Sequence, residues 1–234
     1  MSGSTRGVHR AVKPKSRIGA FWEFGFIVVG ALIISVLVRT FLVQAFFVPS
    51  GSMEQTLMPS DRIVASKIST QISGVHRGEV VVFADPGGWL GPVAQPAGAS
   101  AWVRLSLQFI GVLPGDAAGH LVKRVIGIAG DHVKCCDANG RIVVNSASLV
   151  EPYLNPGVRS DQILFDVTVP PSSIFVLGDN RSESADSRYH LVQNSGSVPV
   201  SDVVGRVVAI IWPWDRLAIL HVPAEFAAVP AAGK

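Results

Sequence analysis

The sequence contains few charged residues and only two cysteines. Charged side chains make up 16% of the 234 residues and hydrophobic ones 48%, which is too apolar for a disordered protein and too weakly charged for a typical cytosolic enzyme. The two cysteines, Cys135 and Cys136, are neighbours, which excludes a disulfide framework and a four-cysteine zinc site. We expect them to be buried neighbours or an oxidised pair rather than a catalytic thiol.

Three common kinds of site also lack their sequence signatures. No G-x-S-x-G nucleophile elbow occurs, and the six histidines include no pair at metal-ligand spacing. Residues 1–44 hold six basic residues and one acid, whereas residues 45–234 hold 14 basic and 16 acidic ones. Because a nucleic-acid footprint needs clustered positive charge, we do not expect the body to bind nucleic acid.

One long hydrophobic run is present, from residue 21 to residue 43 (FWEFGFIVVGALIISVLVRTFLV). Its residues 24–38 carry no charge, and about 20 residues are enough to cross the hydrocarbon core of a bilayer. Five Lys and Arg residues precede the run with no acid among them, which favours a cytoplasmic N-terminus. We therefore expect a cytoplasmic basic arm at residues 1–20, a single transmembrane helix at 21–43 and an extracytoplasmic body.

Two other interpretations of this run are weaker. A buried core helix would not need the cationic arm that precedes it. A cleavable signal peptide is suggested by Val43-Gln44-Ala45, which resembles a small-residue cleavage site, but secretory h-regions usually run for only about 7–15 residues. An uncleaved anchor is therefore favoured.

After the run, the periodicity changes from helical to strand-like. Short segments rich in β-branched residues, each bounded by Gly, Pro, Asp or Asn, lie at residues 62–68, 79–83, 121–128, 141–145, 163–169, 174–177 and 203–211. Such a series predicts a mainly β domain over residues 44–222. Residues 86–118 are expected to form a loop or insert, with the apolar stretch 101–113 as a short helix or interfacial segment. The Ala/Pro-rich tail 223–234 is expected to be flexible.

A serine–lysine pair remains as a nucleophilic arrangement, and it needs a neutral lysine. An ordinary lysine, with a pKa near 10.4, is neutral in only about one molecule in two thousand at pH 7. Burial among apolar groups disfavours the ammonium and lowers this pKa to about 7–8. Lys123 lies in a predicted strand where Leu121 and Val125 flank its stem and Arg124 projects to the opposite face. The alternative is a lysine that reaches solvent from a strand edge.

The candidate serine and a polar loop complete the arrangement. In residues 49–53 (PSGSM), Gly51 leaves room beside Ser52 for an extended peptide. Residues 178–188 (GDNRSESADSR) are dense in short polar side chains that suit the orientation of a neighbouring lysine. Each segment alone is more typical of an ordinary solvated loop, so only their combination indicates a site.

Together these segments resemble the type I bacterial signal peptidases, also called leader peptidases. Five blocks occur in the family's order behind an N-terminal anchor, and the most distinctive is G-D-N-R-x-x-S-x-D-S-R. The blocks are residues 46–57 (FFVPSGSMEQTL), 61–68, 78–83, 122–133 (VKRVIGIAGDHV) and 178–188. The resemblance spans most of the body except residues 86–120 and the tail.

The resemblance implies a serine endopeptidase that removes signal peptides from secreted preproteins. Ser52 matches the nucleophile, and Lys123 matches the general base that later protonates the leaving amine. The Ser52 backbone N–H and the Ser50 hydroxyl match an oxyanion hole, whose donors stabilise charge in the transition state. Ser184 matches the serine that hydrogen-bonds and orients the lysine. Asp186 and Arg188 match a structural ion pair behind the site. Asp179, Asn180 and Arg181 match residues that shape the same loop.

The same resemblance implies the substrate, the fold and the location. Cleavage follows small residues, typically Ala-x-Ala, in shallow apolar pockets whose matching residues are Phe46, Val48, Met53, Leu57, Leu121 and Val122. The implied body is a coiled antiparallel β-barrel. Its partners would be preprotein signal peptides and the lipid bilayer of a bacterial plasma membrane, which the chain would cross once. No cofactor and no metal are implied.

Two departures and two rival interpretations accompany the resemblance. Gln55 and Ala129 replace prolines that are usual in the family, which puts local rigidity in doubt rather than the chemistry. Lys123 places the chain in the bacterial branch, because the eukaryotic and archaeal branch uses histidine there.

A soluble self-cleaving repressor protease is disfavoured by the anchor. A catalytically inactive, membrane-tethered β-domain that binds signal peptides or assists secretion stays open, and activity on an Ala-x-Ala peptide would exclude it.

Overall fold

The computed structural model of the chain describes residues 17–90, 119–155 and 157–233. The predicted apolar segment 101–113 and almost all of the predicted loop 86–118 lie outside these residues.

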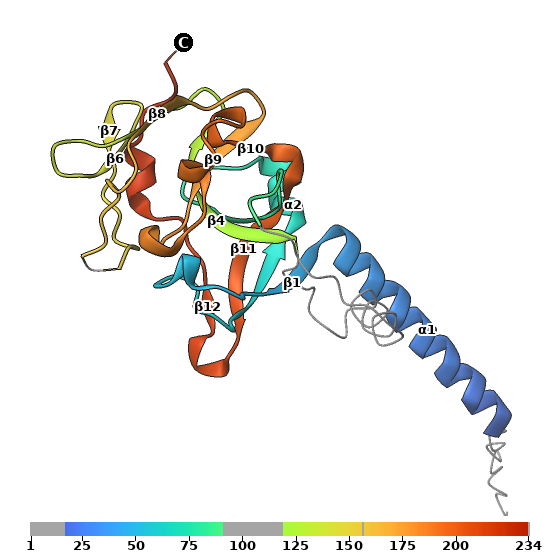
Figure 1. Cartoon of the computed structure of the whole chain (residues 1–234). Helices are drawn as coiled ribbons and strands as arrows, with labels where there is room; N and C mark the ends of the chain where they lie inside the picture. Colours follow the sequence, from blue (N-terminus) through green and yellow to red (C-terminus); the bar gives the residue numbers. More distant parts are fainter. Residues whose placement is uncertain (1–16, 91–118, 156, 234) are drawn as a thin grey trace, which may run out of the picture.

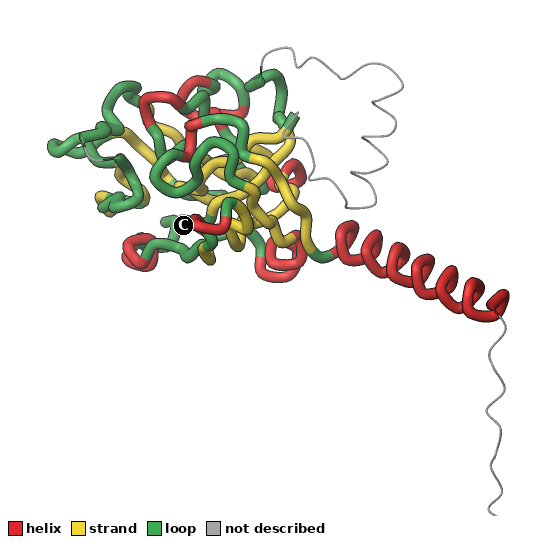
Figure 2. The backbone as a smooth tube through the Cα atoms, turned by 90° about the horizontal axis from the view of Figure 1, so that it is seen from below, coloured by secondary structure: helices red, strands yellow, loops and turns green. Residues whose placement is uncertain are grey.

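Helix α1 (Arg17–Phe41) occupies the long hydrophobic run and projects from the body (Figures 1 and 2). Its 25 residues include no proline, so nothing removes a backbone donor from the helix. Large apolar side chains along it are exposed, among them Trp22 at 65% and Phe26 at 74%. None of the helices in the described part of the chain combines the length and apolarity needed to cross a membrane. The transmembrane helix was predicted at 21–43. The observed helix starts four residues earlier, at Arg17, and ends two residues earlier, at Phe41.

The body consists of two antiparallel sheets (Figure 1). In spatial order, the larger sheet contains β1 (Val43–Phe47), β2 (Arg62–Ser66), β11 (Val203–Trp212), β3 (Val80–Ala84), β4 (His120–Ile128), β9 (Ser173–Leu177) and β10 (Val198–Pro199), and β12 (Ala218–Ile219) pairs with β11. The smaller sheet contains β7 (Ala147–Ser148), β6 (Ile142–Val144), β5 (His132–Cys135) and β8 (Phe165–Thr168). The prediction of a mainly β body is confirmed.

The remaining elements are short helices in the connections between strands. They are α2 (Lys67–Ser73) and the 3₁₀-helices η1 (Gly51–Met53), η2 (Arg181–Glu183), η3 (Ser187–Tyr189), η4 (Asn194–Gly196), η5 (Val200–Asp202), η6 (Trp214–Arg216) and η7 (Ala224–Ala228). The strand predicted at 62–68 ends early because α2 begins at Lys67. Ser66 caps this helix by accepting a hydrogen bond from the Ser69 N–H at 3.4 Å.

Strand pairing does not close the larger sheet. β1 and β10 stand at its two ends, and no pairing joins them among the described residues. β10 has only two residues and pairs with β9, which leaves too little backbone to complete a ring. The closed barrel implied by the resemblance is therefore not found in the hydrogen bonding of the described strands.

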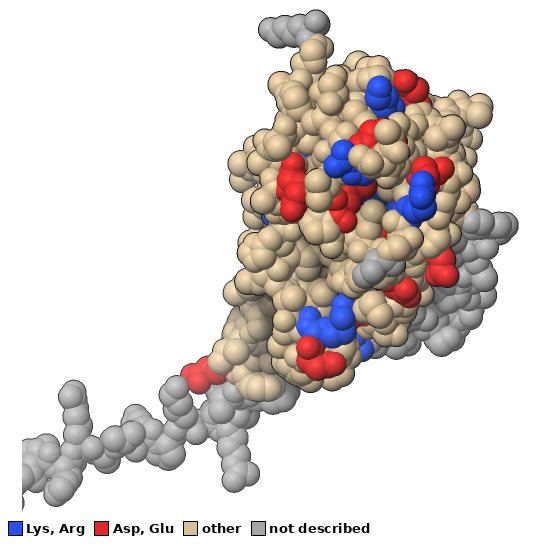
Figure 3. Space-filling model, turned by 90° about the vertical axis from the view of Figure 1, so that its left-hand side faces the viewer, with Lys and Arg blue, Asp and Glu red and all other residues tan. Residues whose placement is uncertain are grey.

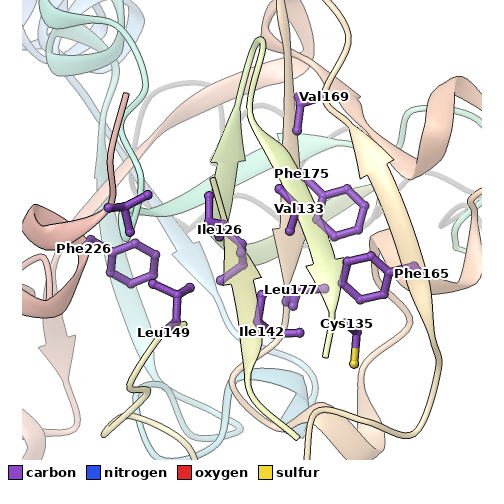
Figure 4. Packing of buried hydrophobic residues seen from close by; sticks show 12 residues of the cluster. Ile126, Val133, Cys135, Ile142, Leu149, Phe165, Val169, Phe175, Leu177 and Phe226 are labelled. Carbon is purple, nitrogen blue, oxygen red and sulfur yellow. The ribbon is translucent and has the colours of Figure 1, made fainter. Parts of the chain in front are cut away.

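Buried apolar side chains form three clusters. The β1 cluster comprises Phe46, Val48, Met53, Leu57, Ile63, Ala65, Val80, Val82, Val207 and Ile210. The Trp89 cluster comprises Val81, Phe83, Trp89, Leu121, Val125, Ile174, Val176 and Val198. The β5 cluster, between the two sheets, is shown in Figure 4 and includes Ile126, Val133, Ile142, Phe165, Phe175 and Phe226.

The pairing of β3 with β4 separates the first two clusters. Val82 lies opposite Val122, and both side chains pack into the β1 cluster. One residue along, Phe83 lies opposite Leu121, and both belong to the Trp89 cluster. Because successive side chains of a strand point to opposite faces, this part of β4 has one face on each cluster.

The C-terminal segment is packed against the body instead of being flexible throughout. Phe226 and Val229 are only 5% and 7% exposed, and the Phe226 ring stacks on Tyr153 with 6.2 Å between ring centroids. A Cβ at Gly78 would lie 2.6 Å from Phe226 Cδ2, so the docked ring needs a glycine there. Within the tail predicted at 223–234, these two side chains are buried because the aromatic ring finds a site on the β5 cluster.

The two cysteines and the surface charges complete the description. Cys135 and Cys136 are joined by a disulfide, so the oxidised pair is the form found. On the face shown in Figure 3, basic and acidic side chains are interspersed over the body rather than gathered by sign.

Candidate active site

Ser52 and Lys123 come together from two distant parts of the chain. Ser52 lies in η1, in the connection between β1 and β2, and Lys123 lies in β4. Lys123 Nζ is 2.6 Å from Ser52 Oγ, within hydrogen-bonding distance. The two residues are 8% and 3% exposed, respectively, so their contact is largely shielded from water.

The surroundings of Lys123 favour its neutral form. Burial lowers the pKa of its ammonium to about 8, against the opposing attraction of the Asp186 and Asp179 carboxylates. The apolar flanks are Leu121 and Val125, which lie on the same side of β4. At pH 7 roughly one molecule in ten then holds a neutral lysine, against about one in two thousand for an ordinary lysine. The pair thus has the short distance and the raised fraction of neutral amine that a general base beside a nucleophile requires.

The turn that carries Ser52 is held by the polar loop 178–188. The Asn180 backbone N–H donates to the Ser52 carbonyl at 3.1 Å, and the Asn180 side-chain amide donates to the Gly51 carbonyl at 3.1 Å. A Cβ at Gly178 would lie 2.5 Å from the Ser52 carbonyl oxygen. The absence of a side chain at Gly178 therefore allows the loop to reach the back of the turn that carries Ser52.

Buried ion pairs fix this loop. Arg188 Nε lies 2.8 Å from Asp186 Oδ1, with both side chains fully buried. The second Asp186 oxygen accepts from the Gly178 N–H at 3.0 Å. Arg181 pairs with Glu151 and donates from Nε to the Gly178 carbonyl at 3.0 Å. The charges thus orient the loop backbone directly behind Ser52 and Lys123.

Asp179 has two partners that the sequence did not reveal. Arg124 pairs with it through Nε at 2.8 Å and Nη2 at 2.6 Å, and Thr56 donates its hydroxyl at 2.5 Å. Arg124 lies on the face of β4 opposite Lys123, as predicted, where it is 2% exposed. The sequence signal for this pair was Arg124, which follows Lys123 directly and faces the opposite side of the predicted strand. If that side is buried, the charge of Arg124 requires a buried acid as its partner.

The expected hydrogen bond between Ser184 and Lys123 is not formed. Ser184 Oγ is buried and has no hydrogen-bond partner among the described residues, and the contact that Lys123 Nζ makes is with Ser52 Oγ. Ser50 Oγ lies 3.4 Å from Ser52 Oγ, so the two hydroxyls are neighbours.

A cavity of about 260 Å³ opens beside the two residues. Five of the six predicted pocket residues line it: Phe46, Val48, Met53, Leu121 and Val122. Leu57 does not line the cavity; it is fully buried behind it in the β1 cluster. Trp89, Leu90 and His120 also line the cavity, and sequence reasoning missed them because they lie in or beside the predicted loop.

Two backbone edges border this cavity. Among the described strands, β1 pairs only with β2, which leaves its other edge unpaired. On β4, pairing with β9 starts at Arg124, so residues 120–123 pair with β3 alone. Unpaired strand edges next to an apolar cavity are suited to an extended peptide, which adds a strand through its backbone. In the described part of the chain, no three His, Cys, Asp or Glu side chains are placed to share a metal ion.

The fold and the site combine antiparallel sheets with a buried serine–lysine contact beside an apolar cavity, an arrangement suited to a serine endopeptidase, and comparison with known proteins identifies the family. Residues 21–212 match the family model described as "Signal peptidase, peptidase S26". The chain is 36% identical to a probable signal peptidase I of Mycobacterium leprae, with 87% of this chain and 80% of that protein covered. It is also 36% identical to a signal peptidase I of Mycobacterium tuberculosis, with 85% and 75% covered. A crystal structure of a signal peptidase I from Enterococcus faecalis aligns at a TM-score of 0.36 and 26% identity, covering 56% of this chain and 95% of that one.

The chain belongs to the signal peptidase family, peptidase S26. It is accordingly a serine endopeptidase, as the resemblance implied.

Proposed function

We propose that this chain removes N-terminal signal peptides from preproteins with Ser52 as the nucleophile and Lys123 as the general base. The observation that carries the proposal is the 2.6 Å contact between Lys123 Nζ and Ser52 Oγ in a buried setting that lowers the lysine pKa to about 8. A neutral amine at this distance accepts the hydroxyl proton as Oγ attacks the scissile carbonyl.

The groove suggests how the substrate is held. The segment before the cut lies extended between the free edge of β1 and residues 120–123 of β4, with its backbone bonded to both. Side chains at positions −1 and −3 then point to one face. On the face of Val122, the cavity is lined by Phe46, Val48 and Met53, and it has room for small apolar groups. This arrangement fits cleavage after Ala-x-Ala.

Charge on the carbonyl oxygen is stabilised beside Ser52. The Ser52 backbone N–H and the Ser50 hydroxyl donate to the oxyanion that forms when Oγ attacks. Ser50 Oγ, 3.4 Å from Ser52 Oγ in the free enzyme, turns toward this oxygen when substrate is bound. The tetrahedral intermediate collapses as the Lys123 ammonium gives its proton to the leaving amine. Lys123 then deprotonates a water that hydrolyses the acyl-enzyme at Ser52.

The supporting groups keep these atoms in place. The Asp186–Arg188 pair and Asn180 fix the loop behind Ser52, and Asp179 with Arg124 fixes its start. Arg181 ties the same loop to Glu151. None of these side chains has to exchange a proton for the reaction to proceed.

We further propose that the enzyme works at a bacterial plasma membrane with its body outside the cytoplasm. Support comes from the five basic residues before the hydrophobic run at 21–43, the exposed apolar side chains on α1 and the short stretch of chain from α1 to the site. β1 begins at Val43, two residues after α1 ends, and from there to Ser52 the chain can span at most about 30 Å. Resistance to carbonate extraction and protease access to the body in spheroplasts test this location. Release by carbonate contradicts it.

The test of the dyad is cleavage of a purified preprotein in detergent by the full chain and two variants, Ser52→Ala and Lys123→Met. Both variants should fold and lose at least about a thousand-fold in rate, because each removes one half of the reacting pair. Matched controls are Ser201→Ala, an exposed serine, and Lys134→Met, a half-exposed lysine in β5; both should keep wild-type activity.

Two outcomes overturn the proposal. Near wild-type activity in Lys123→Met shows that the base lies elsewhere. A wild-type chain that binds the preprotein and never cuts it supports the inactive signal-peptide-binding domain instead.

A further inference from the structure

The segment that follows β3 brings a tryptophan to the groove. The Asp85 carboxylate accepts hydrogen bonds from four backbone N–H groups: those of Gly87 at 3.1 Å, Gly88 at 2.9 Å, Trp89 at 2.8 Å and Leu90 at 3.0 Å. This turn fixes the backbone of residues 85–90 and places Trp89 and Leu90 at the cavity that also contains Ser52.

The Trp89 ring is held on both sides. It stacks on His190 with 4.4 Å between centroids and an interplanar angle of 6°, and it meets the Phe83 ring edge-on at 5.9 Å. Only 8% of the residue is exposed. The ring is therefore a preformed wall of the cavity that a substrate meets without reorganisation.

Strand alternation assigns this wall to one substrate position. A peptide that extends β4 along residues 120–123 continues its pleat, so its side chains alternate between the two faces of that strand. If positions −1 and −3 face the β1 cluster with Val122, position −2 faces the Trp89 cluster with Leu121. The residues on that side of the cavity include Trp89 and Leu90.

We propose that Trp89 and Leu90 form a binding site for the side chain at position −2, the middle residue of Ala-x-Ala, and that this site selects large apolar side chains there. The inference rests on the proposed function, since it takes Ser52 as the point of cleavage. A leucine or phenylalanine at −2 buries its surface on the indole and on Leu90. An aspartate at the same position must give up its water, and the single indole N–H of Trp89 is the only donor that the two side chains offer in return.

Selection at −2 is measured with peptides that share one signal sequence and differ only at that position, as Leu, Phe, Ser or Asp. For the full-length wild type, kcat/KM with Leu or Phe should exceed that with Asp by at least about ten-fold, the scale on which apolar pockets discriminate. Trp89→Ala should reduce this ratio to about two-fold. Trp89→Phe should retain most of it, and Leu90→Ala should give an intermediate ratio.

A ratio between two substrates of the same enzyme does not depend on how much of the variant is folded, so partial instability of Trp89→Ala does not obscure the result. A second ratio, for Ala against Val at −1, should be the same in all variants because that side chain faces the β1 cluster. Trp214→Ala is the matched control; this tryptophan is 71% exposed in η6 and does not line the cavity, so both ratios should stay at wild-type values.

Three results separate the inference from the proposal on which it rests. An unchanged −2 ratio in Trp89→Ala and Leu90→Ala contradicts the inference while Ser52→Ala stays inactive. If Trp89→Ala lowers the −1 ratio and the −2 ratio equally, Trp89 supports the whole groove and not one position, which also contradicts the inference. Cleavage by Ser52→Ala refutes the proposed site itself.

Discussion

Lys123 Nζ and Ser52 Oγ lie 2.6 Å apart although 71 residues separate them in the sequence. The lysine comes from the middle of a sheet and the serine from a short 3₁₀-helix, and the loop 178–188 holds the serine from behind. This one contact, in a nearly dry environment, determines how the activity should depend on pH and how the fold should respond to loss of the lysine.

The rate should follow the titration of Lys123. Burial lowers its pKa to about 8, so kcat/KM should rise about ten-fold per pH unit below that value and level off above it. The measurement is cleavage of a soluble peptide from pH 5 to pH 10, with folding monitored by circular dichroism at each pH. A midpoint above pH 10 would mean that the lysine is not desolvated in the free enzyme.

Lys123→Met should stabilise the protein at neutral pH. The folded-state pKa of Lys123, about 8, is below its ordinary 10.5, so the unfolded chain binds more protons between these values. Burial of the amine therefore costs about 3 kcal/mol below pH 8, and this cost disappears as the pH rises to 10.5.

With allowance for the lost hydrogen bond to Ser52, the variant should be more stable than wild type by about 2 kcal/mol at pH 7 and no more stable at pH 10.5. Urea unfolding of both chains at the two pH values measures the difference. A variant less stable than wild type at pH 7 contradicts the expectation.

Asp186→Asn should move the activity profile to lower pH. The Asp186 and Asp179 carboxylates raise the pKa of Lys123, and Arg188 lowers it, so removing Asp186 leaves only Asp179 to oppose the arginine. The midpoint of kcat/KM against pH should fall below the wild-type value, alongside a loss of stability of about 3–5 kcal/mol from the unpaired buried guanidinium.

Asp215→Asn, which neutralises an exposed acid in η6, should leave the midpoint unchanged. A midpoint that moves to higher pH in Asp186→Asn is opposite to the electrostatic argument.

Gly178→Ala should reduce the activity of the folded enzyme, beyond the loss that comes from a smaller folded fraction. Its Cβ would lie 2.5 Å from the Ser52 carbonyl oxygen, so either the loop or the catalytic turn must shift. A displacement of the reacting atoms by about 1 Å is enough to cost about a hundred-fold in rate. The comparison is Gly205→Ala in β11, where a Cβ would lie 2.7 Å from the Ser66 carbonyl oxygen, away from the site.

Both glycine variants should unfold at lower urea concentration, but only Gly178→Ala should lose kcat per folded enzyme, measured by active-site titration. Equal kcat values for the two variants would show that the loop moves without disturbing Ser52.

Patterns along the chain predicted much of this protein. Alternating β-branched residues between turn-forming ones located all seven predicted segments on strands, because the pleat repeats every two residues. The sequence predicted less about segments whose burial depends on contacts with residues far away in the chain. Residues 223–234 contain Ala and Pro and look flexible, but Phe226 is buried because Gly78 leaves a site for its ring. The early end of β2 went unpredicted because a serine at 66 is compatible with a strand and with a helix cap.

The sequence by itself determined the strand-rich body and the residue types of the dyad, since periodicity and short motifs are local properties. Tertiary structure decided which atoms meet. It placed Lys123 Nζ on Ser52 rather than on Ser184, left β1 and β10 unpaired with each other among the described strands, and put Trp89 beside the cavity. These outcomes depend on contacts between residues far apart in the chain, and the depth of burial that lowers the Lys123 pKa arises only when those contacts form.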